Sequence, residues 1–268
     1  VIQYYYPELD FATANTPVSQ SEKYALFYAE LVKKVAELAA QWMAAGFCHA
    51  VLNTDNMSIT GESFDYGPFA FIPTYKPQFT AAYFDHYGLY CYGNQPFICK
   101  GNLEKLQQPL EGQIDRADME VALAKFDEYY YTTYRQLMVN RLGFEELPEA
   151  EADELLKLTI QLLAETQVDY QGFFFELRKQ LDRTWRDDAS QILSEAETSA
   201  VVAHWREFYC HVLQSLSATD LDKMVDRLRQ QNPEQSLLRP TIEAVWESIS
   251  VEDNWQPFYE LVKQIHDS

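Results

Sequence analysis

Apolar residues recur at helical spacing early in the chain. Residues 21–45 place them three or four positions apart, which predicts one long amphipathic helix. Ser19 or Ser21 can cap its start, and Gly46 is typical of a helix end. The residues that carry this pattern are Tyr24, Phe27, Tyr28, Leu31, Val35, Leu38 and Trp42.

The pattern changes after Gly46. Residues 47–52 and 63–71 are short apolar stretches around a polar turn, and they predict two short strands or extended segments that hold a loop. Residues 73–101 are rich in Tyr, Phe, Gly and Pro, and we interpret them as a long ordered loop. Such a long loop without elements is usually functional.

Beyond residue 102 the pattern is helical almost throughout. Gly143 and Pro148 separate two of the helices, and no fixed internal period indicates a repeat protein. The predicted helices cover residues 103–107, 116–142, 150–165, 170–181, 195–215, 219–230, 238–248 and 256–266. We therefore expect a mainly α protein with a small β element. Composition divides it into residues 1–110 and residues 111–268, which we expect to form one compact unit.

Composition excludes some classes of protein. Apolar residues make up 47% of the 268 residues and aromatic residues 15%, which is incompatible with a mainly disordered chain. The formal net charge of −20 repels phosphate-rich partners, so we expect no nucleic-acid partner and no anionic membrane partner.

The sequence shows no recognisable targeting signal and no cysteine motif. We expect neither a secretory signal nor a membrane-spanning helix, because no suitable apolar run is present. Cys48, Cys91, Cys99 and Cys210 lie too far apart for a zinc knuckle and are too few for a disulfide scaffold. Free thiols and a cytoplasmic location are the expectation.

One segment concentrates polar side chains that could carry chemistry. His49, Asn53, Asp55, Asn56 and Asp65 lie between the apolar stretches that would anchor them. Carboxylate and amide oxygens suit Mg²⁺ or Mn²⁺, which complete their shells with water and phosphate oxygens. A carboxylate that does not bind the metal could accept a proton from an attacking hydroxyl.

A structural interpretation of the same segment stays open. Asn and Asp are frequent in turns because their side chains bond neighbouring backbone amides, so Asn53-Thr-Asp-Asn and Asp65 could each simply form a turn. A single histidine beside an apolar run, like His49, is more often structural than a ligand. No Lys or Arg occurs between Lys34 and Lys76, and the chain has no glycine-rich phosphate cradle. A nucleotide bound here would need cations from elsewhere.

Several strings of residues resemble one known family. These are His49-Ala-Val-Leu-Asn-Thr-Asp-Asn-Met-Ser, Asp65-Tyr-Gly-Pro, Tyr92-Gly-Asn-Gln-Pro and Asn102-Leu. Together they resemble the selenoprotein O (SelO) family of protein adenylyltransferases. The likeness covers most of the chain, is strongest over residues 46–106, and corresponds to the C-terminal part of a family protein about twice as long.

The resemblance implies a fold and an activity. The fold would be a protein-kinase-like C-lobe (a pseudokinase) with a small β element carrying the catalytic loop, followed by additional helices. The activity would be Mg²⁺- or Mn²⁺-dependent transfer of AMP from ATP to Ser, Thr or Tyr hydroxyls of other proteins. ATP, such proteins and a missing N-terminal lobe would then be the partners.

The resemblance also implies residue roles. Asp55 falls at the position of the catalytic base, whereas Asn56 and Asp65 fall at the metal positions through which the ATP phosphates are held. His49 and Asn53 would support the loop. Ala50 stands where the family usually has Gly.

Three functional hypotheses follow. In the first, the chain is the C-terminal lobe of an adenylyltransferase and transfers AMP poorly by itself, because the lobe with the phosphate-binding cations is absent. In the second, it is a non-catalytic helical module that binds a partner protein through its acidic surface or its Tyr/Phe-rich loop. Metal-assisted hydrolysis is disfavoured, since the His and carboxylate spacing matches no zinc-hydrolase motif.

Overall fold

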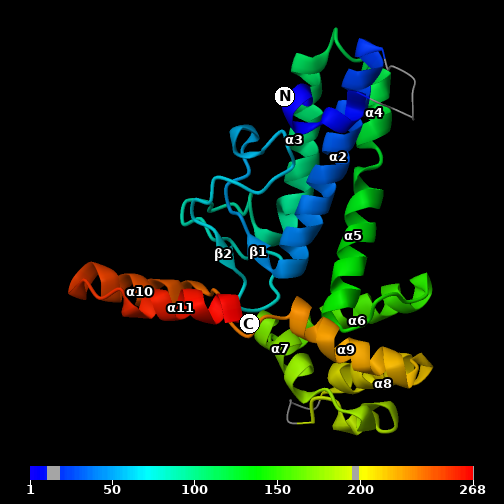
Figure 1. Cartoon of the computed structure of the whole chain (residues 1–268), viewed down its shortest axis with the longest axis vertical. Coiled ribbons are helices and arrows are strands. Elements are labelled where there is room, and N and C mark those ends of the chain that lie inside the picture. Colours follow the sequence, from blue (N-terminus) through cyan, green and yellow to red (C-terminus); the bar gives the residue numbers. More distant parts are fainter. Residues whose placement is uncertain (11–18, 195–198, 268) are drawn as a thin grey trace. The chain divides into compact units, whose positions relative to one another are not determined.

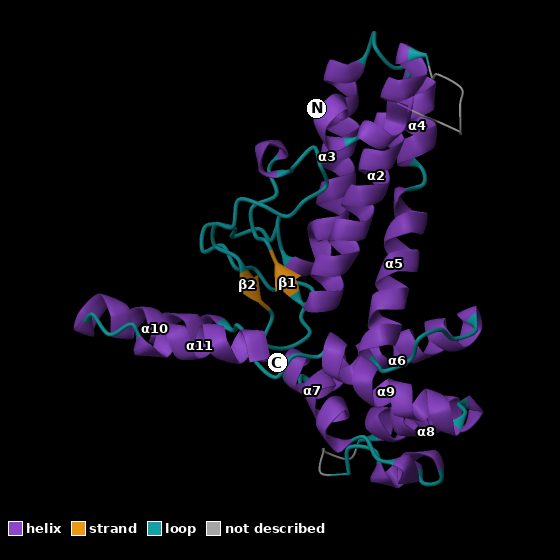
Figure 2. Ribbon diagram, in the orientation of Figure 1, coloured by secondary structure: helices purple, strands orange, loops and turns teal. Residues whose placement is uncertain are grey.

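The structure, a computed structural model, describes residues 1–10, 19–194 and 199–267. It is mainly helical, with two short strands in the described residues (Figure 2), which confirms the predicted mainly α class. The elements are α1 (Ile2–Tyr5), α2 (Gln20–Ala45), β1 (Phe47–Cys48), β2 (Ala70–Phe71), α3 (Gln95–Leu110), α4 (Arg116–Leu123), α5 (Phe126–Arg141), α6 (Glu149–Thr166), α7 (Tyr170–Gln180), α8 (Ala200–Ser215), α9 (Ala218–Gln231), α10 (Arg239–Glu252) and α11 (Gln256–Asp267). Short 3₁₀ helices cover Pro7–Asp10, Thr54–Asn56, Tyr92–Asn94, Arg183–Arg186 and Ala189–Gln191.

Backbone contacts divide the chain into two compact units. Unit 1 contains residues 1–69 and 77–134, and unit 2 contains residues 70–76 and 135–268. The boundary therefore falls inside α5, whereas composition changes near residue 110. The first division reflects backbone contacts, whereas the second reflects the amino-acid composition.

Unit 1 is built on α2. The hydroxyl of Ser19 accepts a hydrogen bond from the backbone N–H of Glu22 at 3.3 Å, and Gly46 ends the helix in the left-handed conformation with φ 68°. The cap gives a partner to an N–H group of the first turn that has none within the helix. Glycine adopts the left-handed conformation at the helix end without a steric clash, because it has no Cβ atom. The same helix packs against α3 and α4 (Figure 1).

The interface between α2 and α3 is partly polar. The buried hydroxyl of Tyr28 donates to the carbonyl of Leu103 at 2.9 Å, and the side-chain amide of Gln107 donates to that hydroxyl at 3.1 Å. The apolar contribution comes from fully buried α2 residues, among them Leu31 and Val35. Helix α3 is thus fixed against α2 by hydrogen bonds as well as by apolar packing.

Unit 2 has an aromatic core under α6, α7 and α8. The ring of Trp205 stacks on Tyr209 with centroids 4.7 Å apart and meets Phe173 edge-on at 5.4 Å. The indole N–H of Trp205 donates to the hydroxyl of Thr159 at 2.9 Å, and the hydroxyl of Tyr209 donates to the carbonyl of Leu142 at 2.8 Å. Every polar tip of these buried rings therefore has a partner.

The last two helices pack on each other. Several of their large apolar side chains remain exposed, including Trp246 (64%), Val251 (76%) and Tyr259 (61%). Among the described residues, no helix combines the length and the apolar composition that crossing a membrane requires.

Most of the predicted helices are confirmed within one to four residues at their ends. The long helix after Ser19 is α2, and residues 150–165, 170–181, 219–230, 238–248 and 256–266 correspond to α6, α7, α9, α10 and α11. The predicted helix at 195–215 is confirmed as α8 from Ala200 onward, and residues 195–198 lie outside the described residues. The predicted strands shrink to two residues each.

Two expectations were wrong, and one helix was missed. Residues 95–101, assigned to the long loop, form the first half of α3, so the predicted helix at 103–107 is only its second half. Pro96 lies in the first turn of α3, where its missing N–H costs nothing, and the helix tolerates Gly101. The predicted helix over 116–142 is two helices, α4 and α5, interrupted near Ala124, whose own backbone stays right-handed helical. The short N-terminal helix α1 was not predicted.

Candidate functional site

The candidate polar loop leaves β1 and turns once before Met57. Its tip is the 3₁₀ turn Thr54–Asn56, on which the side chain of Asp55 is exposed and that of Asn56 is half-buried. The side-chain amide of Asn56 donates to the carbonyl of Val51 at 3.1 Å. This bond uses the nitrogen of the amide and leaves its oxygen available to a ligand.

Two side chains of α3 hold the backbone of this loop. Gln95, fully buried, accepts the backbone N–H of His49 at 2.8 Å and donates to the carbonyl of Phe47 at 2.9 Å. About two turns further on, Asn102 donates to the carbonyl of Leu52 at 2.8 Å. The loop therefore enters and leaves its polar tip through backbone groups that α3 fixes in place.

His49 joins the loop to the segment that carries Asp65. Its buried imidazole makes a hydrogen bond of 2.8 Å from Nε2 to the carbonyl of Phe64, the residue before Asp65. The ring also packs against Trp42, with centroids 5.4 Å apart, and against Tyr66 at 6.1 Å. His49 thus has the supporting, structural position that a histidine beside an apolar run suggests, although its Nδ1 has no partner among the described residues.

Two residues near His49 adopt the left-handed backbone conformation that favours glycine. Asp65 has φ 57°, and its carbonyl accepts the N–H of Gly67 at 2.9 Å. Ala50, fully buried, has φ 72°. Aspartate tolerates this conformation better than most residues, whereas alanine pays about 1–2 kcal/mol for it. The requirement for positive φ gives a physical reason for glycine at the position of Ala50.

Asn53 connects the loop to the aromatic segment before α3. Its side-chain oxygen accepts a hydrogen bond from the hydroxyl of Tyr90. The backbone of that segment is held in turn by Asp85, whose two carboxylate oxygens accept the N–H groups of Leu89 at 2.9 Å and Tyr90 at 2.8 Å. The structure therefore brings Asn53 to a place that sequence spacing did not indicate, beside a residue 37 positions away.

The donor set fits a magnesium ion that keeps most of its ligands outside the protein. Asp55 and Asp65 are exposed, and in the part of the chain that the structure describes their carboxylates make no hydrogen bond or ion pair. No group of three or more His, Cys, Asp and Glu side chains that could hold a metal occurs in the described ranges. One carboxylate and one amide oxygen, completed by water and phosphate, are typical of Mg²⁺ and untypical of Zn²⁺.

A pocket opens beside the loop within unit 1. Its volume is about 590 Å³, and its wall includes Thr54 and Met57 from the loop, Leu31 and Val35 from α2, and Leu106 from α3. Its lining is mixed, with apolar side chains beside polar residues that include Ser58, Asn102 and Lys105. Its volume is of the size that small ligands occupy, but Asp55, Asn56 and Asp65 are not among the residues that line it.

The buried thiols beside the loop are poor nucleophiles. Burial raises the pKa of the Cys48 thiol to about 11 and that of the Cys99 thiol to about 12. Both therefore stay protonated near neutral pH, where a thiolate would be needed for attack. The four cysteines are free, as expected.

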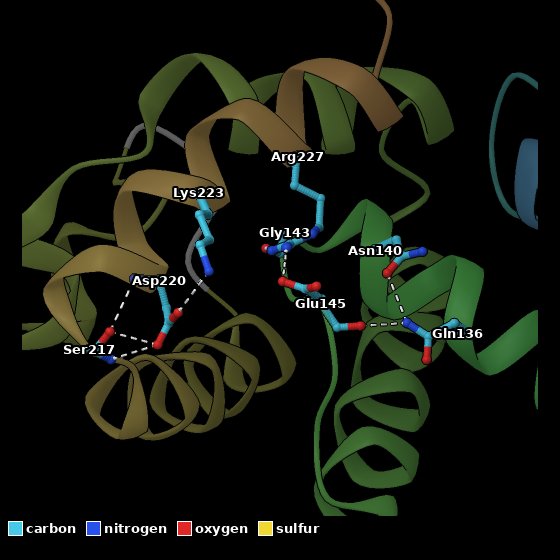
Figure 3. Close-up of polar contacts among 8 residues, drawn as sticks. All are labelled: Gln136, Asn140, Gly143, Glu145, Ser217, Asp220, Lys223 and Arg227. Atoms are coloured by element: carbon cyan, nitrogen blue, oxygen red, sulfur yellow. Dashed lines mark hydrogen bonds and ion pairs between the residues drawn. The ribbon is translucent and has the colours of Figure 1, made fainter.

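A second polar pocket, in unit 2, has four of its charged side chains in ion pairs. Figure 3 shows Arg227 reaching the carbonyl of Gly143 at 2.9 Å and the carboxylate of Glu145 at 2.7 Å. Lys223 faces Asp220 at 3.8 Å along α9. Glu146, the remaining charged residue in the wall of this pocket of about 320 Å³, is exposed and has no ion pair among the described residues. One exposed carboxylate beside two ion pairs does not make a binding site, and we assign the pocket a structural role.

Sequence reasoning missed the two residues that position the loop. Gln95 and Asn102 both lie inside the strings Tyr92-Gly-Asn-Gln-Pro and Asn102-Leu that carry the family resemblance, so a signal was present. Their role was not deducible, because a hydrogen bond to a backbone group leaves no trace in the spacing of residue types. Their contacts with His49 and Leu52 depend on tertiary structure alone.

Comparisons with known proteins match this chain over almost its whole length. The family described as "Protein adenylyltransferase SelO" matches residues 1–266. A protein named protein nucleotidyltransferase YdiU from Trichodesmium erythraeum is 57% identical over 267 residues, which are 100% of this chain and 56% of that protein. Proteins of the same name from Trichormus variabilis (56% identical, 99% of this chain and 54% of that protein) and Vibrio atlanticus (32%, 88% and 46%) are also similar.

The chain spans about half the length of these curated relatives. The likeness is uniform enough to include the polar loop, α3 and the helices of unit 2, since the family match extends over both units.

Proposed function

Because the chain belongs to the SelO family of protein adenylyltransferases, we propose that it is the C-terminal, kinase-like lobe of an enzyme that transfers AMP from ATP to hydroxyl side chains of proteins. The observation that carries this proposal is a set of free acceptor oxygens on a fixed frame. Asp55 and Asp65 are exposed and unpaired within the described residues, while Gln95 and His49 bind the backbone that holds them.

The proposal gives each side chain a task. Asp55 accepts the proton of the attacking hydroxyl as that oxygen bonds to the α-phosphorus and pyrophosphate leaves. Asn56 and Asp65 hold the divalent ion through their side-chain oxygens. When bound, Mg²⁺ would neutralise charge on the triphosphate. His49 and Asn53 are positioning residues, since their contacts are with the chain itself.

The negative charge of the loop supports the proposal that AMP transfer requires a second lobe. No Lys or Arg occurs between Lys34 and Lys76, so the loop adds negative charge to a site that must receive a triphosphate. The cations that offset this charge would come from the remaining length of the family protein. We therefore expect the 268-residue chain by itself to transfer AMP poorly or not at all.

The test uses a variant that is compatible with the backbone conformation of residue 65. Asp65→Asn keeps a residue that tolerates the positive φ of this position but removes its charge, whereas Asp65→Ala would add strain. In a protein completed with the remaining part of the Trichodesmium erythraeum relative, Asp65→Asn should lower Mg²⁺-dependent AMP transfer by about 10²–10³-fold. It should also abolish the thermal stabilisation by Mg²⁺ with an ATP analogue.

Glu62→Gln is the matched control, because Glu62 is also an exposed acid in the same segment but accepts a hydrogen bond from Thr60 at 2.7 Å. It should leave both readouts unchanged. Turnover that survives in Asp65→Asn would remove the metal assignment. Robust transfer by the 268-residue chain alone would remove the need for a second lobe.

A non-catalytic interaction module is the second candidate function, and one observation favours it. Helices α10 and α11 expose Trp246, Val251 and Tyr259, and the turn between them exposes Trp255, apolar side chains of the kind that a binding module would use. The two candidates differ in one measurement. If the completed protein gains no thermal stability from Mg²⁺ with an ATP analogue, the module is favoured.

A further inference from the structure

The segment that leads into α3 presents large apolar side chains to solvent. Tyr83 is 87% exposed, Tyr87 99%, Leu89 50% and Phe84 48%, and these four residues define what we call the aromatic surface. The rings of Tyr83 and Phe84 meet edge-on with centroids 5.3 Å apart. Exposed aromatic side chains that cluster are typical of protein-binding surfaces, because truncating a tyrosine or tryptophan there is often costly for binding.

The backbone under the aromatic surface is fixed. Asp85 accepts the N–H groups of Leu89 and Tyr90, and Gly88, with φ 68°, donates to the carbonyl of Asp85 at 3.3 Å. The flanking residues Ala82 and Tyr92 are buried. The aromatic side chains are therefore held outward by a closed turn, which lowers the entropy lost when a partner binds.

One hydrogen bond ties the segment that carries the aromatic surface to the candidate catalytic loop. Tyr90, next to Leu89, donates its hydroxyl hydrogen to Asn53, two residues before Asp55. A polypeptide whose hydroxyl reaches Asp55 must lie over the neighbouring surface of unit 1. The segment tied to Asn53 offers apolar side chains for that contact.

The charge of the neighbouring residues indicates which kind of polypeptide the aromatic surface binds. Residues 77–99 contain Asp85 but no Lys or Arg, and Asp55 and Asp65 stand exposed on the loop. A chain segment with basic residues is attracted to such a surface, and an acidic one is repelled. The overall charge of −20 acts in the same direction at longer range.

Building on the proposed function, we infer that the aromatic surface docks the acceptor polypeptide. The favoured acceptor segment carries an apolar side chain near its hydroxyl residue, together with a basic residue. The apolar side chain packs on Tyr83 and Tyr87, and the hydroxyl faces Asp55.

Direct peptide binding tests this inference without any AMP transfer. The probes are fluorescent peptides with one serine, flanked by two leucines and two arginines, by two asparagines and two arginines, or by two leucines and two glutamates. The first should bind the chain and the completed protein, with the other two at least about tenfold weaker. Tyr83→Ser with Tyr87→Ser should weaken the first peptide about tenfold, whereas Tyr4→Ser, which changes a tyrosine that is 79% exposed on α1, should not.

Three results would overturn the inference. The first is equal affinity for the three peptides, and the second is a loss of affinity in Tyr4→Ser equal to that in Tyr83→Ser with Tyr87→Ser. The third is binding by the chain that is lost in the completed protein, because this would show that the family's remaining part covers the aromatic surface. A dimer broken by Tyr87→Ser would identify a second copy as the occupant instead. Asp55→Asn separates the two proposals, because it should abolish transfer while it weakens the first peptide by much less than the tenfold expected for Tyr83→Ser with Tyr87→Ser. Peptide binding without transfer in the completed wild-type protein would refute the proposed function alone.

Discussion

The buried side chain of Gln95 is expected to be the strongest single support of the catalytic loop. It accepts the N–H of His49 at 2.8 Å and donates to the carbonyl of Phe47 at 2.9 Å, with no exposed surface of its own. Gln95→Met preserves length and removes both polar atoms. The N–H of His49 then loses its partner, at about 1–3 kcal/mol, and the carbonyl of Phe47 loses one accepted hydrogen bond, at about 0.5–1.5 kcal/mol, which gives about 1.5–4.5 kcal/mol together.

The chain offers a matched control on the same helix. Gln107 is 1% exposed, its amide nitrogen donates to the hydroxyl of Tyr28 at 3.1 Å, and its Oε1 has no partner among the described residues. Gln107→Met removes one neutral hydrogen bond together with an unsatisfied oxygen. The expected cost is therefore only about 0–1.5 kcal/mol.

The measurement combines global and local stability. Urea unfolding followed by circular dichroism gives the difference in unfolding free energy, and amide hydrogen exchange at His49 gives the local opening of the loop. Gln95→Met should speed that exchange strongly, and Gln107→Met should not. Equal costs for the two variants, or unchanged exchange at His49, would refute the idea that Gln95 fixes the loop.

Three further predictions concern backbone strain and burial. Ala50→Gly should cost about 2–3 kcal/mol less than Ala39→Gly in urea unfolding. Both remove a buried methyl group, but only Ala50 is relieved of a positive φ of 72°, and only Ala39 lies inside a helix, where glycine costs about 1 kcal/mol; equal costs would contradict this. Gly143→Ala should destabilise by about 1–3 kcal/mol more than Gly112→Ala, since both have positive φ but only at Gly143 would the new Cβ lie 2.6 Å from a buried methionine; the test fails if thermal unfolding gives the same shift for both. Burial raises the pKa of Cys48 from 9.0 to about 11, so the folded state favours the thiol, and its contribution to stability is complete below pH 9 and is lost as pH rises toward 11. The fall in stability between these pH values should be shallower in Cys48→Ala, and an unchanged slope would argue against the shift.

Helices α6, α7 and α8 of unit 2 were predictable because each buries one apolar face. In α8 the buried residues Trp205, Tyr209 and Val212 recur at helical spacing, so the pattern of residue types reports the element directly. The polar loop was also visible, since Asp55 and its neighbours interrupt two apolar stretches. Whether Asn56 and Asp65 bind a metal stays a prediction.

Helix α3 shows what the sequence alone did not determine. Its buried face includes Gln95, Asn102 and Gln107, so an apolar period is absent over its first half. Gln95 and Asn102 are polar because they face backbone groups of a loop some fifty positions earlier in the chain, at Phe47, His49 and Leu52. Gln107 bonds instead to the hydroxyl of Tyr28 on α2. Local periodicity records which residues avoid water, and it therefore determined the helical class and the place of the loop. The hydrogen bonds between distant segments, which fix that loop, were decided only when the tertiary structure brought them together.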